Sequence, residues 1–434
     1  MILRENINNF WASLIIEEMV RNGVELFCIS PGSRSTPLTV AAARHAGAEC
    51  VVCHDERGAA FMALGFGKAT GRLAALICTS GTAAANYFPA IVEAHMDDTP
   101  LFVLTADRPP ELLDSAANQT ILQENIYSDY VRWSVTLPPP SENVSAHFVL
   151  TTVDQALHRA VTHPAGPVHL NCQFREPLAP TPTEFIEKED SQLIRWEKGN
   201  KPFTIYCNPT LTINDNDIHR IADIVNACEN GLIILGRRNM LQQRQPEIDA
   251  LLSTLGWPVH ADIASGFRLG AQDLPVLDEL SFQNIDKLKS IKPEIILHLG
   301  GTFISKKLQQ HLESLQPAHY ILVHENPKRI DPGHVLTQRL QCDVAIFASQ
   351  LTTLVDRKNL FVKNEQLMEK QIDDLLSSHA LSEPGFARMV SQHLPAGHGL
   401  FLSNSMPVRD MNEFAAQDCD VHPVGTNRGA SGID

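Results

Sequence analysis

Short apolar runs recur along the chain at intervals that suit the strands of a buried parallel sheet. Strands that are apolar on both faces need cover on both faces, and helices that alternate with the strands provide it. Segments with helical periodicity do separate these runs. The first part of the chain therefore predicts a doubly wound α/β domain over residues 1–182. Its strands are expected at residues 26–29, 50–53, 76–79, 101–105 and 168–171.

A second series of strand-like and helical segments follows a proline-rich linker. Pro177, Pro180 and Pro182 mark this linker, because proline interrupts both helices and sheets. A central α/β domain is expected over residues 183–361. The turn from Leu235 to Arg238 could suggest a dinucleotide site, but no G-x-G-x-x-G motif follows a strand in the sequence, so this indication is weak. The strands of this domain are predicted at residues 232–235, 295–299 and 320–323, and its helices at 244–255 and 305–314.

Residues 362–434 are expected to begin a third domain. The segment opens with an amphipathic helical pattern and later contains a strand that ends at Asn404 and Ser405. An α/β domain usually needs roughly 100 residues or more, so this domain is expected to be incomplete. The whole chain is thus predicted to form consecutive doubly wound parallel-sheet domains of the α/β class.

Composition excludes several classes of function. The 434 residues carry a net charge of −15, which argues against nucleic acid or an anionic membrane as a general partner. The N-terminus lacks a long apolar segment and a cleavage site, and charges interrupt every apolar stretch. A cytoplasmic location is therefore expected. Cys50 and Cys53 have C-x-x-C spacing, but no second pair accompanies them, and both fit one buried strand with a structural role.

A carboxylate follows the second predicted strand, where a helix is expected to begin. The apolar run stops at the letters HDER, which contain Glu56, and Gly58 opens the helical pattern. In open α/β sheets, ligands bind at the carboxyl ends of the strands, so Glu56 is a candidate site residue. The alternative is that Glu56 only favours the dipole of the helix that it begins. His54 lies beside Glu56 and could tune the site, but the favoured interpretation is a packed or solvent-facing histidine.

Four further motifs carry polar side chains at the ends of predicted strands or helices. SPGSRS follows the first strand, a Ser-Gly-Thr turn follows the third, and TADRPPEL follows the fourth. The chain closes on NRGASGID. The side chains of interest in and near these motifs are Ser33, Arg34, Ser80, Asn86, Arg108, Asn118, Gln119 and Arg428.

Together these motifs resemble the aminopyrimidine-binding domain of thiamine-diphosphate enzymes. That family carries a glutamate after its second strand and a TSG turn with an asparagine after it. SPGSRS, HDERG, TADRPPEL and NRGASGID are similar to the carboligases of menaquinone biosynthesis. The resemblance implies that Glu56, Ser80 and Asn86 bind thiamine diphosphate, and that Glu56 and Gln119 are catalytic. Glu56 would face N1′ of the aminopyrimidine and favour the tautomer that removes the proton from the thiazolium C2.

The same resemblance implies a reaction between two acids. The substrate 2-oxoglutarate loses CO₂, and the resulting succinyl carbanion equivalent adds to isochorismate. Both substrates are dicarboxylates, and arginine binds a carboxylate through two parallel hydrogen bonds. For any one arginine alone, a surface charge or a salt bridge is the more frequent role. The family pattern gives these substrate-binding candidates: Ser33, Arg34, Arg108, Asn118, Lys306 (with Lys307 as its alternative), Ser405, Arg409 and Arg428.

The resemblance stops short of the diphosphate site. Thiamine-diphosphate enzymes hold the diphosphate and its Mg²⁺ (or Mn²⁺) in their third domain, in a motif that begins Gly-Asp-Gly or a close variant. No such motif follows NRGASGID, so no metal ligand is predicted here, and the expected ligands lie beyond the end of this chain. Two alternatives stay open: a non-catalytic truncated remnant or partner subunit, and another thiamine-diphosphate decarboxylase or carboligase. The family builds its site between two subunits, which implies a homodimer or homotetramer.

Overall fold

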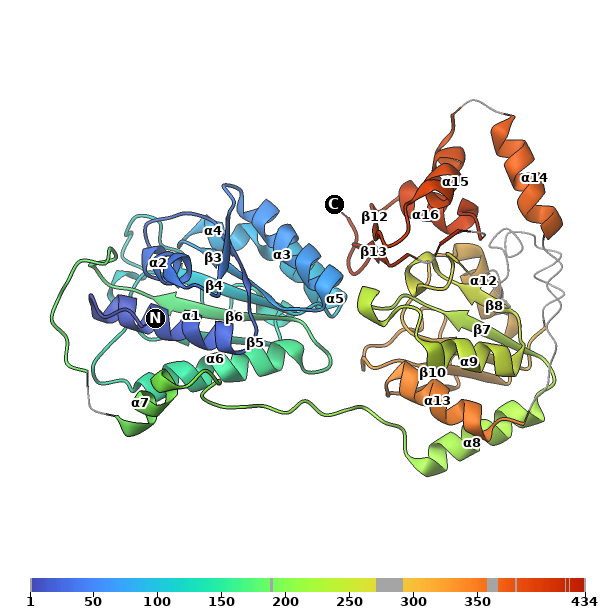
Figure 1. Cartoon of the computed structure of the whole chain (residues 1–434), viewed down its shortest axis with the longest axis horizontal. Helices are drawn as coiled ribbons and strands as arrows, with labels where there is room; N and C mark the ends of the chain where they lie inside the picture. Colours follow the sequence, from blue (N-terminus) through green and yellow to red (C-terminus); the bar gives the residue numbers. More distant parts are fainter. Residues whose placement is uncertain are drawn as a thin grey trace. The chain divides into compact units, whose positions relative to one another are not determined.

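The computed structural model describes residues 2–187, 190–270, 292–356, 366–378, 381–417, 419–420 and 422–432. The chain divides into two compact units (Figure 1). Unit 1 contains Met1–Pro209 together with Arg428–Ser431, and unit 2 contains Thr210–Asn427 together with Gly432–Asp434. The domain boundaries expected at residues 182 and 361 stay predictions. The expected start of the third domain, residue 362, lies outside the described residues.

Unit 1 is built on a six-stranded parallel sheet. The strand order is β2-β1-β3-β4-β6-β5. All five predicted strands form, and β1 has the predicted bounds. The half-buried strand β5 was not predicted, because its run WSVTL is not continuously apolar. The strands are β1 (Leu26–Ile29), β2 (Glu49–Val52), β3 (Ala74–Cys78), β4 (Leu101–Asp107), β5 (Trp133–Leu137) and β6 (Pro167–Gln173).

Helices cover both faces of this sheet, which confirms the doubly wound fold of the first domain (Figure 1). Side chains alternate between the two faces of a strand. Phe27 and Ile29 therefore join the core formed with α1, α2 and α6, whereas Leu26 and Cys28 join the core formed with α3, α4 and α5. The helices are α1 (Ile7–Arg21), α2 (Thr36–Arg44), α3 (Glu56–Thr70), α4 (Thr82–Asn86), α5 (Phe88–Met96), α6 (Ala146–Val161) and α7 (Ser191–Lys198), with short 3₁₀ turns η1 (Pro110–Leu112) and η2 (Ser128–Tyr130).

The second predicted strand is wrong in one respect, because β2 is not buried. It is an edge strand of the sheet, and among the described residues it pairs only with β1. Val52 is 61% exposed, and Cys50 and Cys53 are only half-buried. The exposure therefore comes from the open edge, since Cys50 packs against one core of unit 1 and Val51 packs against the other. Both cysteines are free thiols, and their structural role stays a prediction.

Unit 2 contains a five-stranded parallel sheet with the order β11-β10-β9-β7-β8. The three predicted strands form, and β9 has the predicted bounds. The helix expected at 244–255 begins at Pro246 instead, because proline suits the first turn of a helix. The elements are β7 (Gly231–Leu235), β8 (Val259–Ala261), β9 (Ile295–Leu299), β10 (His319–Val323), β11 (Gln338–Leu340), α8 (Asp215–Ala227), α9 (Pro246–Leu255), α12 (Lys306–Leu315), α13 (Val344–Leu354), η3 (Met240–Gln242) and η4 (Ile263–Ser265).

The last part of unit 2 is a small two-stranded parallel sheet with helices around it. Its buried side chains, Leu402 and Val408 among them, share a core with Ile263 and Leu269. The elements are α14 (Gln366–Ser377), α15 (Glu383–His393), β12 (Leu400–Leu402), α16 (Met406–Phe414) and β13 (Val424–Thr426). Across the described parts of both units, no helix has the length and apolar character needed to span a membrane.

Candidate active site

Glu56 lies where β2 ends and α3 begins. Asp55 caps the helix, since its carboxylate accepts the backbone N–H of Gly58 at 2.8 Å. Glu56 occupies the first turn, where the helix dipole favours a negative charge. Its side chain is half-buried, and its Oε2 accepts a hydrogen bond of 3.3 Å from Nδ2 of Asn86. The structure therefore brings together two of the residues that we expect to bind the cofactor.

The turn after β3 lies against the loop that carries Gln119. Ser80 Oγ donates to the carbonyl oxygen of Gln119 at 3.1 Å, and Nε2 of Gln119 donates to the carbonyl oxygen of Ser80 at 2.8 Å. Gly81 has φ +90°, and a Cβ there would lie 2.9 Å from Cγ of Gln119. Only glycine suits this position, because the backbone is left-handed and the loop packs directly on it. Two of the predicted site residues, Ser80 and Gln119, thus lie in direct contact.

Arg34 is buried two residues before α2, with 5% of the residue exposed. Its Nη1 donates to the carbonyl oxygen of Phe174 at 2.9 Å, and its Nη2 lies 3.4 Å from the exposed carboxylate of Glu176. Among the described residues, its Nε has no hydrogen-bond partner. Ser33 precedes it and is exposed. The arginine therefore keeps one buried donor available beside a solvent-facing hydroxyl.

Arg108 follows β4 and reaches the loop that carries Asn118. Its backbone N–H donates to Oδ1 of Asp107 at 2.7 Å, and its Nη2 donates to the carbonyl oxygen of Asn118 at 3.0 Å. Its Nε is buried and has no hydrogen-bond partner among the described residues. Asn118 and Gln119 are exposed. The two predicted substrate-binding residues Arg108 and Asn118 thus lie together.

A buried polar network below these loops escaped prediction from the sequence. Asn171 Nδ2 donates to Oδ2 of Asp107 at 2.8 Å, and Gln123 Nε2 donates to Oδ1 of Asn171 at 3.0 Å. Thr105 Oγ1 joins Oδ1 of Asn171 at 2.8 Å and a ring nitrogen of His169 at 2.7 Å. Burial raises the pKa of Asp107 and lowers the pKa of His169 to about 3. Polar letters inside the apolar strand PVHLNCQ were the signal that could have revealed it.

The remaining candidate site residues are described within the unit to which each belongs. Lys306, its alternative Lys307, Ser405 and Arg409 belong to unit 2 and are exposed. Lys306 begins α12, and Ser405 precedes α16 with φ +66°. Arg428 belongs to unit 1 and is half-buried.

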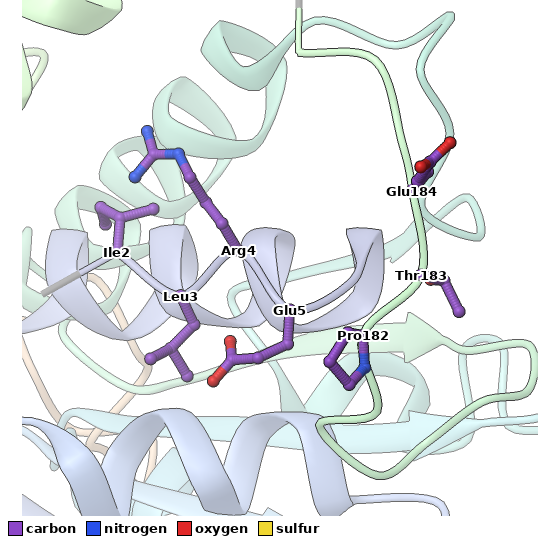
Figure 2. Close-up of a pocket in the computed structure, with 7 residues that line it drawn as sticks. All are labelled: Ile2, Leu3, Arg4, Glu5, Pro182, Thr183 and Glu184. Carbon is purple, nitrogen blue, oxygen red and sulfur yellow. The ribbon is translucent and has the colours of Figure 1, made fainter.

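No metal ligand is assigned to the described residues, because they contain no group of three or more His, Cys, Asp or Glu side chains that could hold an ion. Figure 2 shows a cavity in unit 1 between the start of the chain and the segment after β6. None of the predicted site residues lines it. Its lining residues are Ile2, Leu3, Arg4, Glu5, Pro182, Thr183 and Glu184.

Two family models match the chain. The model of the N-terminal TPP binding domain of thiamine pyrophosphate enzymes matches residues 11–130, which include Glu56, Ser80 and Asn86. The model of the middle domain of these enzymes matches residues 188–402. Thiamine pyrophosphate is the same compound as thiamine diphosphate. The parallel sheet, the half-buried glutamate and these matches define a thiamine-diphosphate enzyme.

Curated relatives narrow the family further. The 2-succinyl-5-enolpyruvyl-6-hydroxy-3-cyclohexene-1-carboxylate synthase of Salinibacter ruber is 40% identical, over 99% of this chain and 74% of the relative. The synthase of the same name from Rubrobacter xylanophilus is 42% identical, over 98% of this chain and 75% of the relative. A third synthase of this name, from Chlorobium phaeobacteroides, is 40% identical, over 99% of this chain and 75% of the relative. The chain belongs to this family of synthases.

Proposed function

We propose that this chain catalyses the reaction for which its relatives are named. It uses thiamine diphosphate with Mg²⁺ or Mn²⁺ to decarboxylate 2-oxoglutarate and to add the succinyl carbanion equivalent to isochorismate, in menaquinone biosynthesis. The contact between Glu56 and Asn86 at the carboxyl ends of the unit 1 strands is the structural observation that carries the proposal. Identity of about 40% along nearly the whole chain supports it.

The residues of unit 1 suit the aminopyrimidine end of the cofactor. Thiamine diphosphate supplies a nucleophilic carbon and an electron sink when it is bound. Glu56 would hold a proton at the ring nitrogen N1′, in a charge-assisted hydrogen bond worth about 1.5–3 kcal/mol. Asn86 orients this carboxylate through its amide. Ser80 lies in the adjacent turn as a further cofactor contact.

The substrate-binding side chains are those that can pair with carboxylates. Arg34 and Arg108 each keep a buried Nε without a partner in the described residues. A buried donor without a partner costs about 1–3 kcal/mol, and a bound carboxylate would recover this energy. Gln119, held beside Ser80, is the second catalytic residue. Further hydrogen bonds and charges come from Ser33, Asn118, Lys306, Ser405, Arg409 and Arg428.

The assembly and the location of the chain also belong to this proposal. The chain acts in the cytoplasm, as a homodimer or homotetramer. Residues 362–434 form the start of the diphosphate-binding domain. The alternative is a chain that folds and associates but does not turn over substrate.

The proposal is tested by a binding measurement followed by a reaction measurement. Calorimetry with thiamine diphosphate and Mg²⁺ on this 434-residue chain should show micromolar binding, about −8 kcal/mol. Incubation with 2-oxoglutarate and isochorismate should then release CO₂ and form the coupled acid. Binding without product would favour another thiamine-diphosphate activity. Absence of both would overturn the proposal for this chain and favour the non-catalytic alternative.

A further inference from the structure

The side chain of Gln123 is buried in an irregular loop and contacts three separate parts of unit 1. The residue is 1% exposed. Its Oε1 accepts the backbone N–H of Gly81 at 2.8 Å. Its Nε2 donates to Oδ1 of Asn171 at 3.0 Å and to the carbonyl oxygen of Ala106 at 3.2 Å. One amide group therefore joins the turn after β3 to the ends of β4 and β6.

The first of these contacts holds the turn that we assign to the cofactor. Gly81 directly follows Ser80, which exchanges two hydrogen bonds with Gln119. Gln119 has φ +59°, a conformation that residues other than glycine rarely adopt. Such a backbone persists only where its surroundings hold it. The bonds from Ser80 and the anchor that Gln123 provides four residues further on supply that restraint.

The second contact leads to the substrate side of the site. Asn171 donates to Oδ2 of Asp107 at 2.8 Å, and Oδ1 of Asp107 accepts the backbone N–H of Arg108 at 2.7 Å. Nη2 of Arg108 in turn donates to the carbonyl oxygen of Asn118, the residue before Gln119. Together with the covalent links from Asn118 to Gln119 and from Ser80 to Gly81, the hydrogen bonds therefore form a closed ring. In order, the ring passes through Gly81, Gln123, Asn171, Asp107, Arg108, Asn118, Gln119 and Ser80.

We propose that Gln123 is a positioning residue of this enzyme. It fixes the Ser80-Gly81 turn and the Asn118-Gln119 loop as one rigid unit, so that the Gln119 amide keeps its place beside the cofactor turn. Gln123 does not touch substrate in this arrangement, because it is buried below the loop. The inference rests on the proposed function for the roles of Ser80 and Gln119, whereas the ring itself is independent of it.

The amide of Gln123 offers two substitutions that separate its contacts. Gln123→Glu keeps an oxygen that accepts the Gly81 N–H but removes the donor to Asn171 and Ala106. Gln123→Met removes all three hydrogen bonds with a side chain of similar size. Gln243 in unit 2 provides a matched control. Its amide donates to Ala264 and Val424 and accepts the backbone N–H of Val424, so Gln243→Met removes a comparable set of bonds away from the ring.

The experiment measures hydrogen exchange of peptides that span residues 79–84 and 117–124, together with kcat and KM. In Gln123→Met, exchange in both peptides should rise about tenfold, and kcat should fall about tenfold while the KM values change less. In Gln123→Glu, the first peptide should stay protected. Gln243→Met should leave both peptides at the exchange rate of the unsubstituted chain.

Two results would overturn the proposal. One is unchanged exchange in both peptides in Gln123→Met. The other is faster exchange spread evenly over all of unit 1, which indicates a purely structural role. If Gln123→Met does not fold, faster exchange of the second peptide in Gln123→Glu supports the proposal, and unchanged exchange of that peptide rejects it. If the unsubstituted chain forms no product, the proposed function fails, but the exchange of these peptides still decides whether Gln123 holds the loop.

Discussion

Lys68 and Glu93 form a buried ion pair between α3 and α5, with Nζ 3.1 Å from Oε1 and 5% of each side chain exposed. Asp97 lies 2.7 Å from the same Nζ. The Glu93 carboxylate also accepts the backbone N–H groups of Gly429 at 2.8 Å and Ala430 at 2.7 Å. A Cβ at Gly429 would lie 2.8 Å from the carbonyl oxygen of Glu93, which explains the glycine in NRGASGID. A buried charge therefore holds the segment that contains Arg428.

Glu93→Ala should destabilise unit 1 and release this segment. Removing one partner of a buried ion pair costs about 3–5 kcal/mol, and the loss should lie at the lower end because Asp97 still faces Lys68. Urea unfolding measures the loss, and hydrogen exchange at residues 428–432 measures the release. Glu142→Ala is the control, because Glu142 is exposed and accepts a different backbone N–H, from Ile186 at 2.7 Å. Equal exchange in both variants would contradict this assignment.

Glu56→Gln should lower turnover by about 10² to 10⁴, because the amide cannot take the place of the carboxylate at N1′. The fold should be retained, since Asp55 still caps α3. Asp55→Asn is the matched control, as it removes a neighbouring charge but keeps an oxygen for the Gly58 N–H. Steady-state kinetics with saturating cofactor measures both variants. Near-normal turnover in Glu56→Gln would refute its catalytic role.

Arg409→Gln should raise the KM for one of the two acid substrates by about 10- to 100-fold. A charge-assisted hydrogen bond contributes about 1.5–3 kcal/mol, and the neutral amide supplies only a weaker one. Arg409 is exposed on α16, so the fold should be unaffected. Arg220→Gln removes another exposed arginine of unit 2 and should leave both KM values unchanged. The same KM values in both variants would exclude Arg409 from the site.

Local sequence patterns predicted the strands and helices better than they predicted the buried residues that hold the site in place. The run that became β1 is apolar throughout, and the run that became β9 is interrupted only by His298, so the sequence marks their bounds. The short strands β8 and β11 lack such a run. The motif residues Glu56 and Asn86 meet because parallel strands bring their carboxyl ends to one edge of the sheet. Gln123 could not be predicted, because its partners lie far away in the sequence and only the fold unites them.

The stability of unit 1 should depend on pH through His169. Burial lowers the pKa of this imidazole from an ordinary 6.5 to about 3, so the folded chain keeps it neutral in that range. Between about pH 6.5 and pH 3 the unfolded chain binds more protons than the folded one, so the free energy of unfolding falls as the pH falls. The contribution of His169 is at most about 1.4 kcal/mol per pH unit.

His169→Gln should flatten this dependence, because glutamine binds no proton and its amide can still donate to Thr105. Urea unfolding at pH 7, 6, 5 and 4 measures the difference in stability between the unsubstituted chain and the variant. That difference should shift in favour of the variant as the pH falls. His219→Gln, at an exposed position on α8, is the control and should follow the unsubstituted chain at every pH. Parallel curves for His169→Gln and the unsubstituted chain would show that the buried imidazole does not control the acid sensitivity.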